Sequence, residues 1–229
     1  MFKAIEKIKD AIQKSNVRTV IDPAVFNDPL ALQTDWSPAS PGGSNFKTHK
    51  LHEVNGQRME FRATMGMMLF AGIFLVVGLG IMAIAPWRLW ITGEPFAKDM
   101  ILLPIFGLLF AGVGGYMLYS ALTPIVFDTG HGYFCKNRRK PEHSFTVVDI
   151  KNHVPLTRIH ALQLISERVS SSNSQGRSSS YKSHELNLVL NDGTRLNVVD
   201  HGCVTTIRAD ARRLAAFLGK PLWDATDPA

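Results

Sequence analysis

The chain has 229 residues, a net charge of +6 and a pI near 9.4. This length allows a pair of membrane-spanning segments and one modest soluble domain. The positive charge gathers beside two apolar segments rather than along one element that could read bases, which argues against nucleic-acid binding. A basic protein of this kind suits an anionic inner leaflet, where each nearby Lys or Arg contributes about 1 kcal/mol.

Residues 1–16 predict an amphipathic basic helix. Its lysines lie mostly opposite an apolar face made of Phe2, Ile5, Ile8, Ala11 and Ile12. Such a helix lies on a membrane surface or docks on a partner. Packing against the chain's own domain is an equal alternative.

Residues 17–45 predict an extended linker. Asp22-Pro23, Asp28-Pro29, Ser37-Pro38 and the run 40–43 interrupt this segment too often for a helix or a long strand. Its apolar residues are too numerous for a solvated tether: Val20, Val25, Phe26, Leu30, Leu32 and Trp36. We therefore expect the linker to lie along another surface, with that of a partner protein as one candidate.

Residues 46–62 predict a β-hairpin. Strands at 46–54 and 57–62 flank Asn55-Gly56, the dipeptide most typical of a two-residue hairpin turn. The second strand leads directly into the first apolar segment.

Residues 63–127 predict a hairpin of two transmembrane helices. The spans 64–86 and 100–127 carry no charged side chain, and each is long enough to cross the hydrocarbon layer. Core helices of soluble proteins rarely run so far without a charge. Ionisable residues inside the membrane usually mark ion or proton pathways, so their absence from these spans favours an anchor over a channel or transporter.

The flanking charges predict the orientation. Nine Lys or Arg precede the first span, whereas the loop 87–99 has only Arg88 and Lys98. The positive-inside rule then places both termini in the cytoplasm and the loop outside. In a bacterium this would be the inner membrane. A basic cluster follows the second span and is a candidate contact for lipid headgroups, or only a topology signal: Lys136, Arg138, Arg139 and Lys140.

Small residues predict how the two helices pack. Gly107, Ala111 and Gly115 fall on one face of the second helix, and Gly72 and Gly80 on one side of the first. Small side chains let helix backbones approach closely. We expect this face to pack the hairpin against itself, with a homo-oligomer as the alternative.

Residues 128–229 predict a β domain with a C-terminal helix at 204–218. Strands are expected at 125–128, 133–136, 145–150, 156–169, 185–190 and 194–199, with a Ser-rich loop at 170–180. Gly219 and Pro221 end the helix. Because the strands before and after the membrane hairpin emerge at one membrane face, we expect them to join a single sheet of about seven strands.

Three features lie within about residues 120–220: the stretch 127–134 (FDTGHGYF), the stretch 154–159 (VPLTRI) and the final helix. A β domain that carries them and is closed by a C-terminal helix resembles the pleckstrin-homology-like fold. Bacterial membrane proteins with two spans and a cytoplasmic module of this type are similar. The resemblance implies a binding or scaffolding module without a defined catalytic centre.

Asp200, His201 and Cys203 lie between the last strand and the last helix. A thiol at a helix N-terminus has a lowered pKa, as a nucleophile requires. The simpler interpretation is a turn in which Asp200 or a neighbour caps the helix. Neither Cys135 nor Cys203 belongs to a CxxC pair, and the histidines are scattered, so we expect no metal and no cofactor.

Together these patterns predict a membrane-anchored, non-enzymatic binding or scaffolding module. Its protein partner would be recognised by residues 1–45 or by the β domain. One alternative is a membrane-associated thiol enzyme or redox sensor that uses Cys203 and His201. Another is a protective protein that captures a toxic protein.

Overall fold

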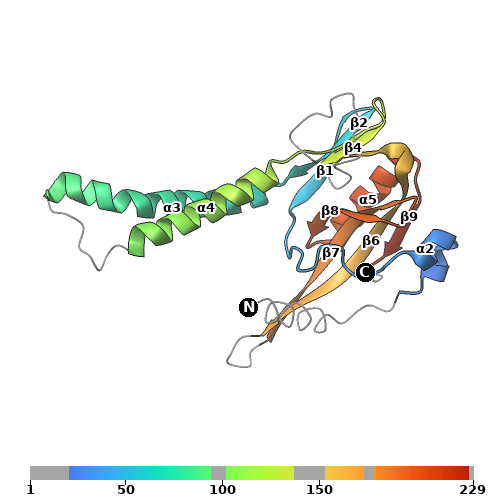
Figure 1. Cartoon of the computed structure of the whole chain (residues 1–229), viewed down its shortest axis with the longest axis horizontal. Coiled ribbons are helices and arrows are strands. Elements are labelled where there is room, and N and C mark those ends of the chain that lie inside the picture. The colour runs from blue at the N-terminus through green and yellow to red at the C-terminus, as the bar shows by residue number, and fades with distance from the viewer. Residues whose placement is uncertain (1–20, 94–101, 137–152, 173–177, 227–229) are drawn as a thin grey trace. The chain divides into compact units, whose positions relative to one another are not determined.

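The computed structural model describes residues 21–93, 102–136, 153–172 and 178–226 (Figure 1). The chain divides into a helical unit, residues 63–123, and a sheet unit made of the residues on either side of it. The helix predicted at 1–16 and the strand predicted at 145–150 lie outside the described residues.

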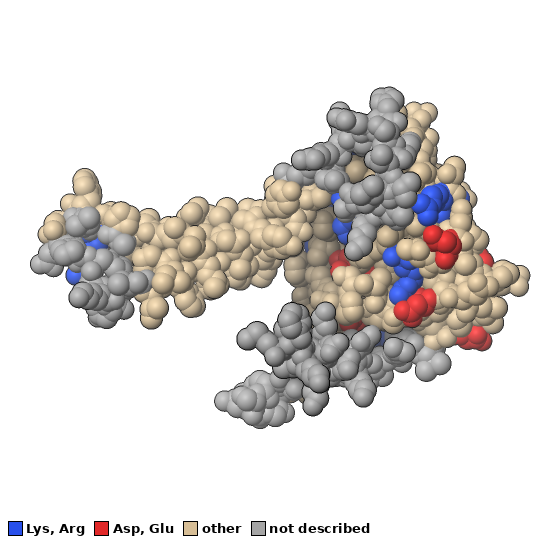
Figure 2. All heavy atoms as spheres, viewed as in Figure 1, with Lys and Arg blue, Asp and Glu red and all other residues tan. Residues whose placement is uncertain are grey.

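The helical unit consists of α3 (Met65–Thr92) and α4 (Leu102–Ala121), both long and apolar enough to span a membrane. Figure 2 shows this unit without charged side chains over most of its length on the visible face. The first helix continues six residues beyond Pro86, where we expected it to end. The second ends earlier than expected, because Pro124 disfavours helical backbone in the residue before it.

The first sheet has the order β1 (His49–Asn55), β2 (Arg58–Ala63), β3 (Ile125–Asp128), β4 (Tyr133–Lys136) and β5 (His153–Pro155). Strand β2 pairs antiparallel with β3. The chain therefore leaves the sheet at the end of β2, forms the helical unit, and returns in the neighbouring strand. The helical unit is an insertion between two hydrogen-bonded strands.

The second sheet has the order β8 (Arg195–His201), β7 (Ser178–Leu190), β6 (Ile159–Ser172) and β9 (Leu222–Ala225). The described strands thus form two sheets, not the single sheet we expected. The ends of the predicted Ser-rich loop are strand, since Ser170–Ser172 pair with Ser178–Ser180 and prolong the ladder between β6 and β7. The short parallel strand β9 carries no alternating pattern and was not among the predicted strands.

One core lies between the two sheets and α5 (Val204–Leu218), a helix with the bounds that its apolar stripe predicted. Ile207, Ala211 and Leu214 of the helix are fully buried among aromatic and aliphatic side chains of both sheets. Gly219 ends the helix in a left-handed conformation, with φ of 62°.

The predicted linker contains a short 3-10 helix, η1 (Pro23–Phe26), and a short helix, α2 (Pro29–Gln33). Asp22-Pro23 and Asp28-Pro29 were predicted to interrupt helical structure, but each pair begins a turn of helix. The aspartate accepts a backbone N–H as N-cap, and proline at the first helical position has no N–H that needs a partner.

The linker also lies on the chain's own domain. Phe26 stacks on Trp36 with 5.1 Å between ring centroids, and both contact Trp223 of β9. These rings belong to a second, smaller apolar cluster that includes Ala161 and Val189. The surface that the linker covers is therefore the second sheet of the same chain.

Candidate functional site

Residues 34–46, here called the strap, cross one face of the second sheet. Along β7, Leu186 and Leu188 point into the core with α5, whereas Glu185 and Asn187 point to the opposite face, as alternation in a strand requires. We call that opposite face the strap face. Its polar side chains are Gln163, Glu167, Tyr181, Ser183, Glu185, Asn187 and Arg195.

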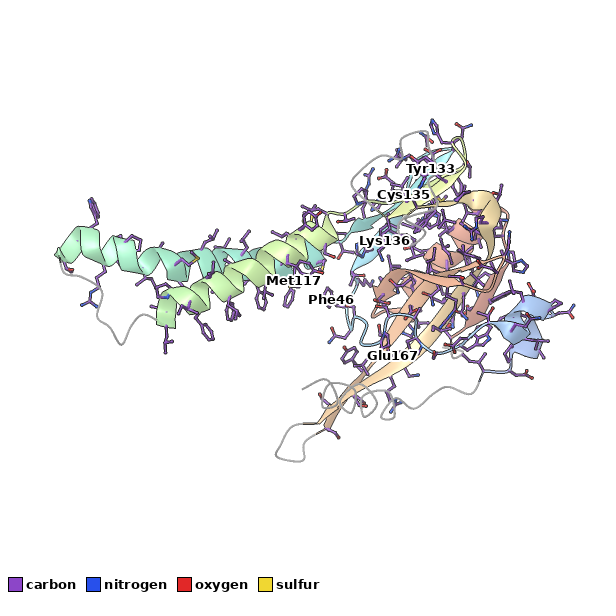
Figure 3. All side chains as sticks on the ribbon, viewed as in Figure 1. Phe46, Met117, Tyr133, Cys135, Lys136 and Glu167 are labelled. Carbon is purple, nitrogen blue, oxygen red and sulfur yellow. The ribbon has the colours of Figure 1, made fainter. Side chains whose placement is uncertain are left out.

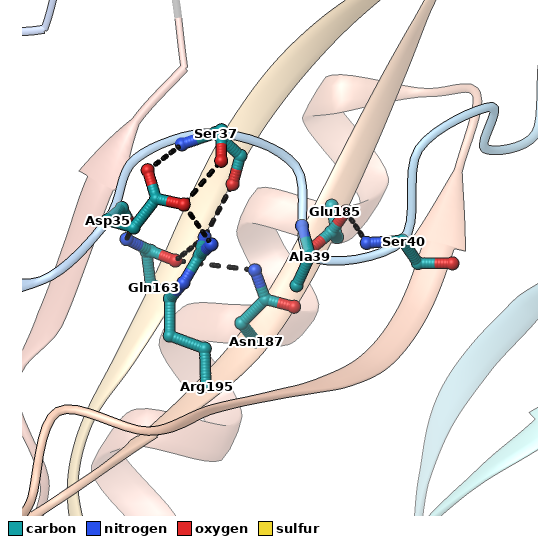
Figure 4. Close-up of polar contacts among 8 residues, drawn as sticks. All are labelled: Asp35, Ser37, Ala39, Ser40, Gln163, Glu185, Asn187 and Arg195. Atoms are coloured by element: carbon teal, nitrogen blue, oxygen red, sulfur yellow. Dashed lines mark hydrogen bonds and ion pairs between the residues drawn. The ribbon is translucent and has the colours of Figure 1, made fainter. Parts of the chain in front are cut away.

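Two buried carboxylates fasten the middle of the strap. The Glu185 carboxylate accepts the backbone N–H groups of Ala39 and Ser40 at 2.8 and 3.1 Å (Figure 4). The Glu167 carboxylate accepts the N–H of Gly42 at 3.1 Å. Both glutamates are at most 5% exposed, so these charge-assisted bonds replace the water that each carboxylate lost on folding.

Arg195 holds the beginning of the strap. Its guanidinium donates to the backbone oxygen of Ser37 and forms an ion pair with Asp35 at 3.0 Å. Gln163 donates to the Asp35 backbone oxygen at 3.1 Å and accepts from Arg195 and from Asn187 (Figure 4). This network connects three strands of the sheet to one turn of the strap.

The strap's last residues approach the sheet closely. The Tyr181 hydroxyl donates to the Gly43 backbone oxygen at 2.9 Å, and the Gly202 N–H donates to the Phe46 oxygen at 2.9 Å. A Cβ on Gly43 would collide with the Ser183 hydroxyl and come within 3.2 Å of Asp200 Cβ. Only glycine fits this position without displacing the strap.

Two polar atoms on the strap face have no hydrogen-bond partner among the described residues. They are Ser183 Oγ and Asn187 Oδ1, and their side chains are at most 1% exposed. A buried acceptor such as the Asn187 oxygen is nearly always satisfied in folded proteins. The strap covers these groups without bonding to them.

Asp200 and Lys136 lie beside this network. Burial and the nearby Glu185 carboxylate raise the pKa of Asp200 to about 6, although Asn197 and Lys136 oppose the shift. Burial lowers the pKa of Lys136, and the carboxylates of Asp200 and Glu185 limit that shift. The acids and the lysine therefore form one interacting group of charges.

Lys136, one of the four basic residues predicted to contact lipid headgroups, is labelled at the end of β4 in Figure 3. Its ammonium donates to the backbone oxygens of Asn197 and Val198 at 3.2 and 2.9 Å. The lysine thus satisfies carbonyls of β8 instead of reaching outward. The other three members of the predicted cluster, Arg138, Arg139 and Lys140, lie outside the described residues.

His49 and His201 are further buried bases of the sheet unit. Burial, then the Lys136 charge and His201, lower the pKa of His49 to about 4. Burial also lowers the pKa of His201. Both histidines are therefore neutral at physiological pH, where a second positive charge beside Lys136 would be unfavourable.

Cys203, not Asp200, occupies the N-cap position of α5, and its side chain accepts no capping bond. His201 Nδ1 lies 3.0 Å from the Cys203 backbone N–H, so the ring faces the backbone rather than the thiol. Hydrogen bonds from the hydroxyls of Thr205 and Thr206 lower the pKa of Cys203 to about 7. The contact of His201 Nδ1 with Cys203 is thus made to its backbone N–H and oxygen.

Of the five residues predicted to pack the helices, Gly107 and Ala111 lie at the contact of α3 with α4. A Cβ on Gly107 would approach Gly78 O within 2.8 Å, and a Cβ on Gly78 would collide with the Ala111 backbone. Gly72, Gly80 and Gly115 have nothing within 4 Å of such a Cβ, so they point away from this contact. Another close approach is made by Gly114, the neighbour of Gly115, against Ala71 and Leu75.

Among the described residues, no group of three His, Cys, Asp or Glu side chains is placed to hold a metal ion. No protein-family model, curated protein sequence or solved structure matches the chain.

The sequence did not indicate the strap face as a site. Its signal was the presence of Gln163, Glu167, Glu185 and Asn187 inside strands that also carry the apolar residues of the core. Such residues occur equally on a solvated sheet face, and nothing in the sequence showed that the segment at 34–46 would cover them.

Proposed function

We propose that the chain is a membrane-anchored, non-enzymatic binding or scaffolding module that recognises a protein partner at the cytoplasmic face of the membrane. The carrying observation is the insertion of two apolar helices between β2 and β3. One residue, Thr64, connects β2 to α3, and a short segment ending in Pro124 connects α4 to β3.

The arrangement of the sheet unit supports a binding role. We propose a pleckstrin-homology-like fold class for this unit, since its strands form two sheets, antiparallel except at β9, that share one core with α5. Glu167 and Glu185 are engaged in fastening the strap, and Lys136 satisfies strand carbonyls. Residues 1–45 and the sheet unit are the two candidate binding regions.

An affinity pull-down from detergent-solubilised native membranes tests this proposal. The baits are the full chain and a chain beginning at residue 21, which removes the segment predicted as an amphipathic helix and keeps the strap. A stoichiometric protein retained by both baits supports recognition through the sheet unit, and retention by the full chain alone supports the N-terminal segment. Retention of no protein by either bait contradicts the proposal.

Thiol chemistry at Cys203 is the second candidate, because the pKa of this thiol is lowered to about 7. A thiolate is then present in quantity at neutral pH, and iodoacetamide should alkylate Cys203 faster than the buried Cys135. Threonine-to-valine changes at positions 205 and 206 should slow that reaction. A redox role requires, in addition, that alkylation changes partner binding, and an alkylated chain that binds normally excludes it.

A further inference from the structure

We propose that the strap face of the second sheet is a binding face for an extended protein segment, and that the strap is its replaceable occupant. This inference deepens the proposed function and rests on it, since it takes the ligand to be protein. It names the surface and the kind of segment that surface accepts.

The strap is bound in the way that a peptide is bound. None of its residues, all of which are described, belongs to a strand. Its N–H groups at Ala39, Ser40 and Gly42 go to side-chain carboxylates instead of a neighbouring strand. The main core lies on the other face of the sheet, so removing the strap would leave the packing around α5 in place.

The strap is an incomplete occupant. It covers Asn187 Oδ1 and Ser183 Oγ without supplying a hydrogen-bond partner to either. A buried polar group that has lost water and gained no partner is a net cost to the bound state. A competing segment that brings a donor to Asn187 would recover this loss and bind the same face more tightly.

The charges of the face indicate what that segment carries. Glu167, Glu185 and Asp200 are acidic, and the strap brings no Lys or Arg to them. At the other end, Arg195 pairs with Asp35. The fitting ligand is an extended segment with an acidic residue for Arg195, followed by N–H or O–H donors for the carboxylates of Glu167 and Glu185.

Amide hydrogen exchange on the full chain in detergent tests whether the strap detaches. We expect its amides to exchange through a local opening while those of β6 and β7 stay protected. Glu185→Gln should speed exchange at Ala39 and Ser40 about 10- to 100-fold, because a charge-assisted acceptor is lost. The control Glu53→Gln, on the exposed part of β1, should change nothing.

The inference is overturned if the strap amides exchange at the same rate as the amides of β6 and β7, because the strap then opens only when the sheet unfolds. Loss of protection in β6 and β7 on Glu185→Gln would overturn it as well, because the strap would then be part of the fold.

A labelled synthetic peptide of residues 34–46 tests whether the face accepts a segment from outside. Its targets are the natural full chain and the full chain with Trp36→Ala, which weakens the resident strap at its aromatic contact with Trp223. We expect the variant to bind the peptide at least about tenfold more tightly, since the competing strap is weaker. A peptide carrying Asp35→Lys should lose binding, because it repels Arg195.

No binding to a Trp36→Ala chain that keeps its protection in β6 and β7 contradicts the inference, and so does unfolding of that variant. These outcomes are independent of the pull-down. If the strap detaches but the pull-down retains no protein, the binding face is supported and the proposed protein partner is contradicted.

Discussion

Phe61 and Ile125 lie opposite each other in paired strands, although the whole helical unit separates them in the sequence. Both side chains are nearly inaccessible, at 1% and 2% exposure, and belong to the core beneath α5. The sheet therefore closes only when the two ends of the helical unit come together. Folding of the sheet unit and formation of the helical hairpin should be coupled for this reason.

Truncating this pair should strongly destabilise the sheet unit. We expect Phe61→Ala to lower the free energy of unfolding by about 3–5 kcal/mol, because a large core side chain leaves a cavity. Val54→Ala, on the exposed part of β1, should cost less than about 0.5 kcal/mol. Denaturant unfolding in detergent, followed by tryptophan fluorescence, measures both. A small loss for Phe61→Ala would contradict the shared core.

The close contact of α3 with α4 should reject large side chains. Gly78→Leu should destabilise the helical hairpin by about 1–3 kcal/mol or more, because its side chain meets the Ala111 backbone. The matched Gly72→Leu should be tolerated, since that position is open. Unfolding by SDS, followed by circular dichroism, compares the two. Equal effects would show that the packing face is wrong.

Asp200 should make the sheet unit less stable as pH rises. Its pKa is about 6 in the folded chain against 3.8 as the ordinary value, so its unfavourable charge forms mainly above pH 6. The stability linked to its protonated form is present below pH 4 and lost as pH rises through 6. Asp200→Asn should raise stability at pH 8 by up to about 3 kcal/mol and change it little at pH 4. Melting temperatures across this range measure the difference.

His49 should make the sheet unit less stable as pH falls. Its folded pKa of about 4 lies below the ordinary 6.5, so the unfolded chain binds a proton first as pH falls. The neutral ring's contribution is complete above pH 6.5 and is lost as pH decreases to 4. His49→Gln should reduce the loss of stability between pH 6.5 and pH 4. His52→Gln, at an exposed position of the same strand, should leave that loss unchanged. If His49→Gln loses as much stability between pH 6.5 and pH 4 as the natural chain, another group is responsible for the pH dependence.

The sequence alone determined the elements whose signals are local. The stripe at 204–218 with Gly219 behind it predicted α5, Asn55-Gly56 predicted the turn between β1 and β2, and two uncharged apolar runs predicted α3 and α4. Helix periodicity, turn geometry and membrane length each depend on residues within one short window. For these features the neighbours in the chain carry nearly all of the physical information.

Only the tertiary structure decided which side chains meet. Lys136 turns inward because β8 presents carbonyls to it, and Glu167 and Glu185 become buried because the strap lies across them. Gly114, not its neighbour Gly115, faces the opposite helix, since a step of one residue turns the side-chain direction by about 100°. Burial and pairing depend on segments far apart in the chain, and their energies exist only after those segments come together.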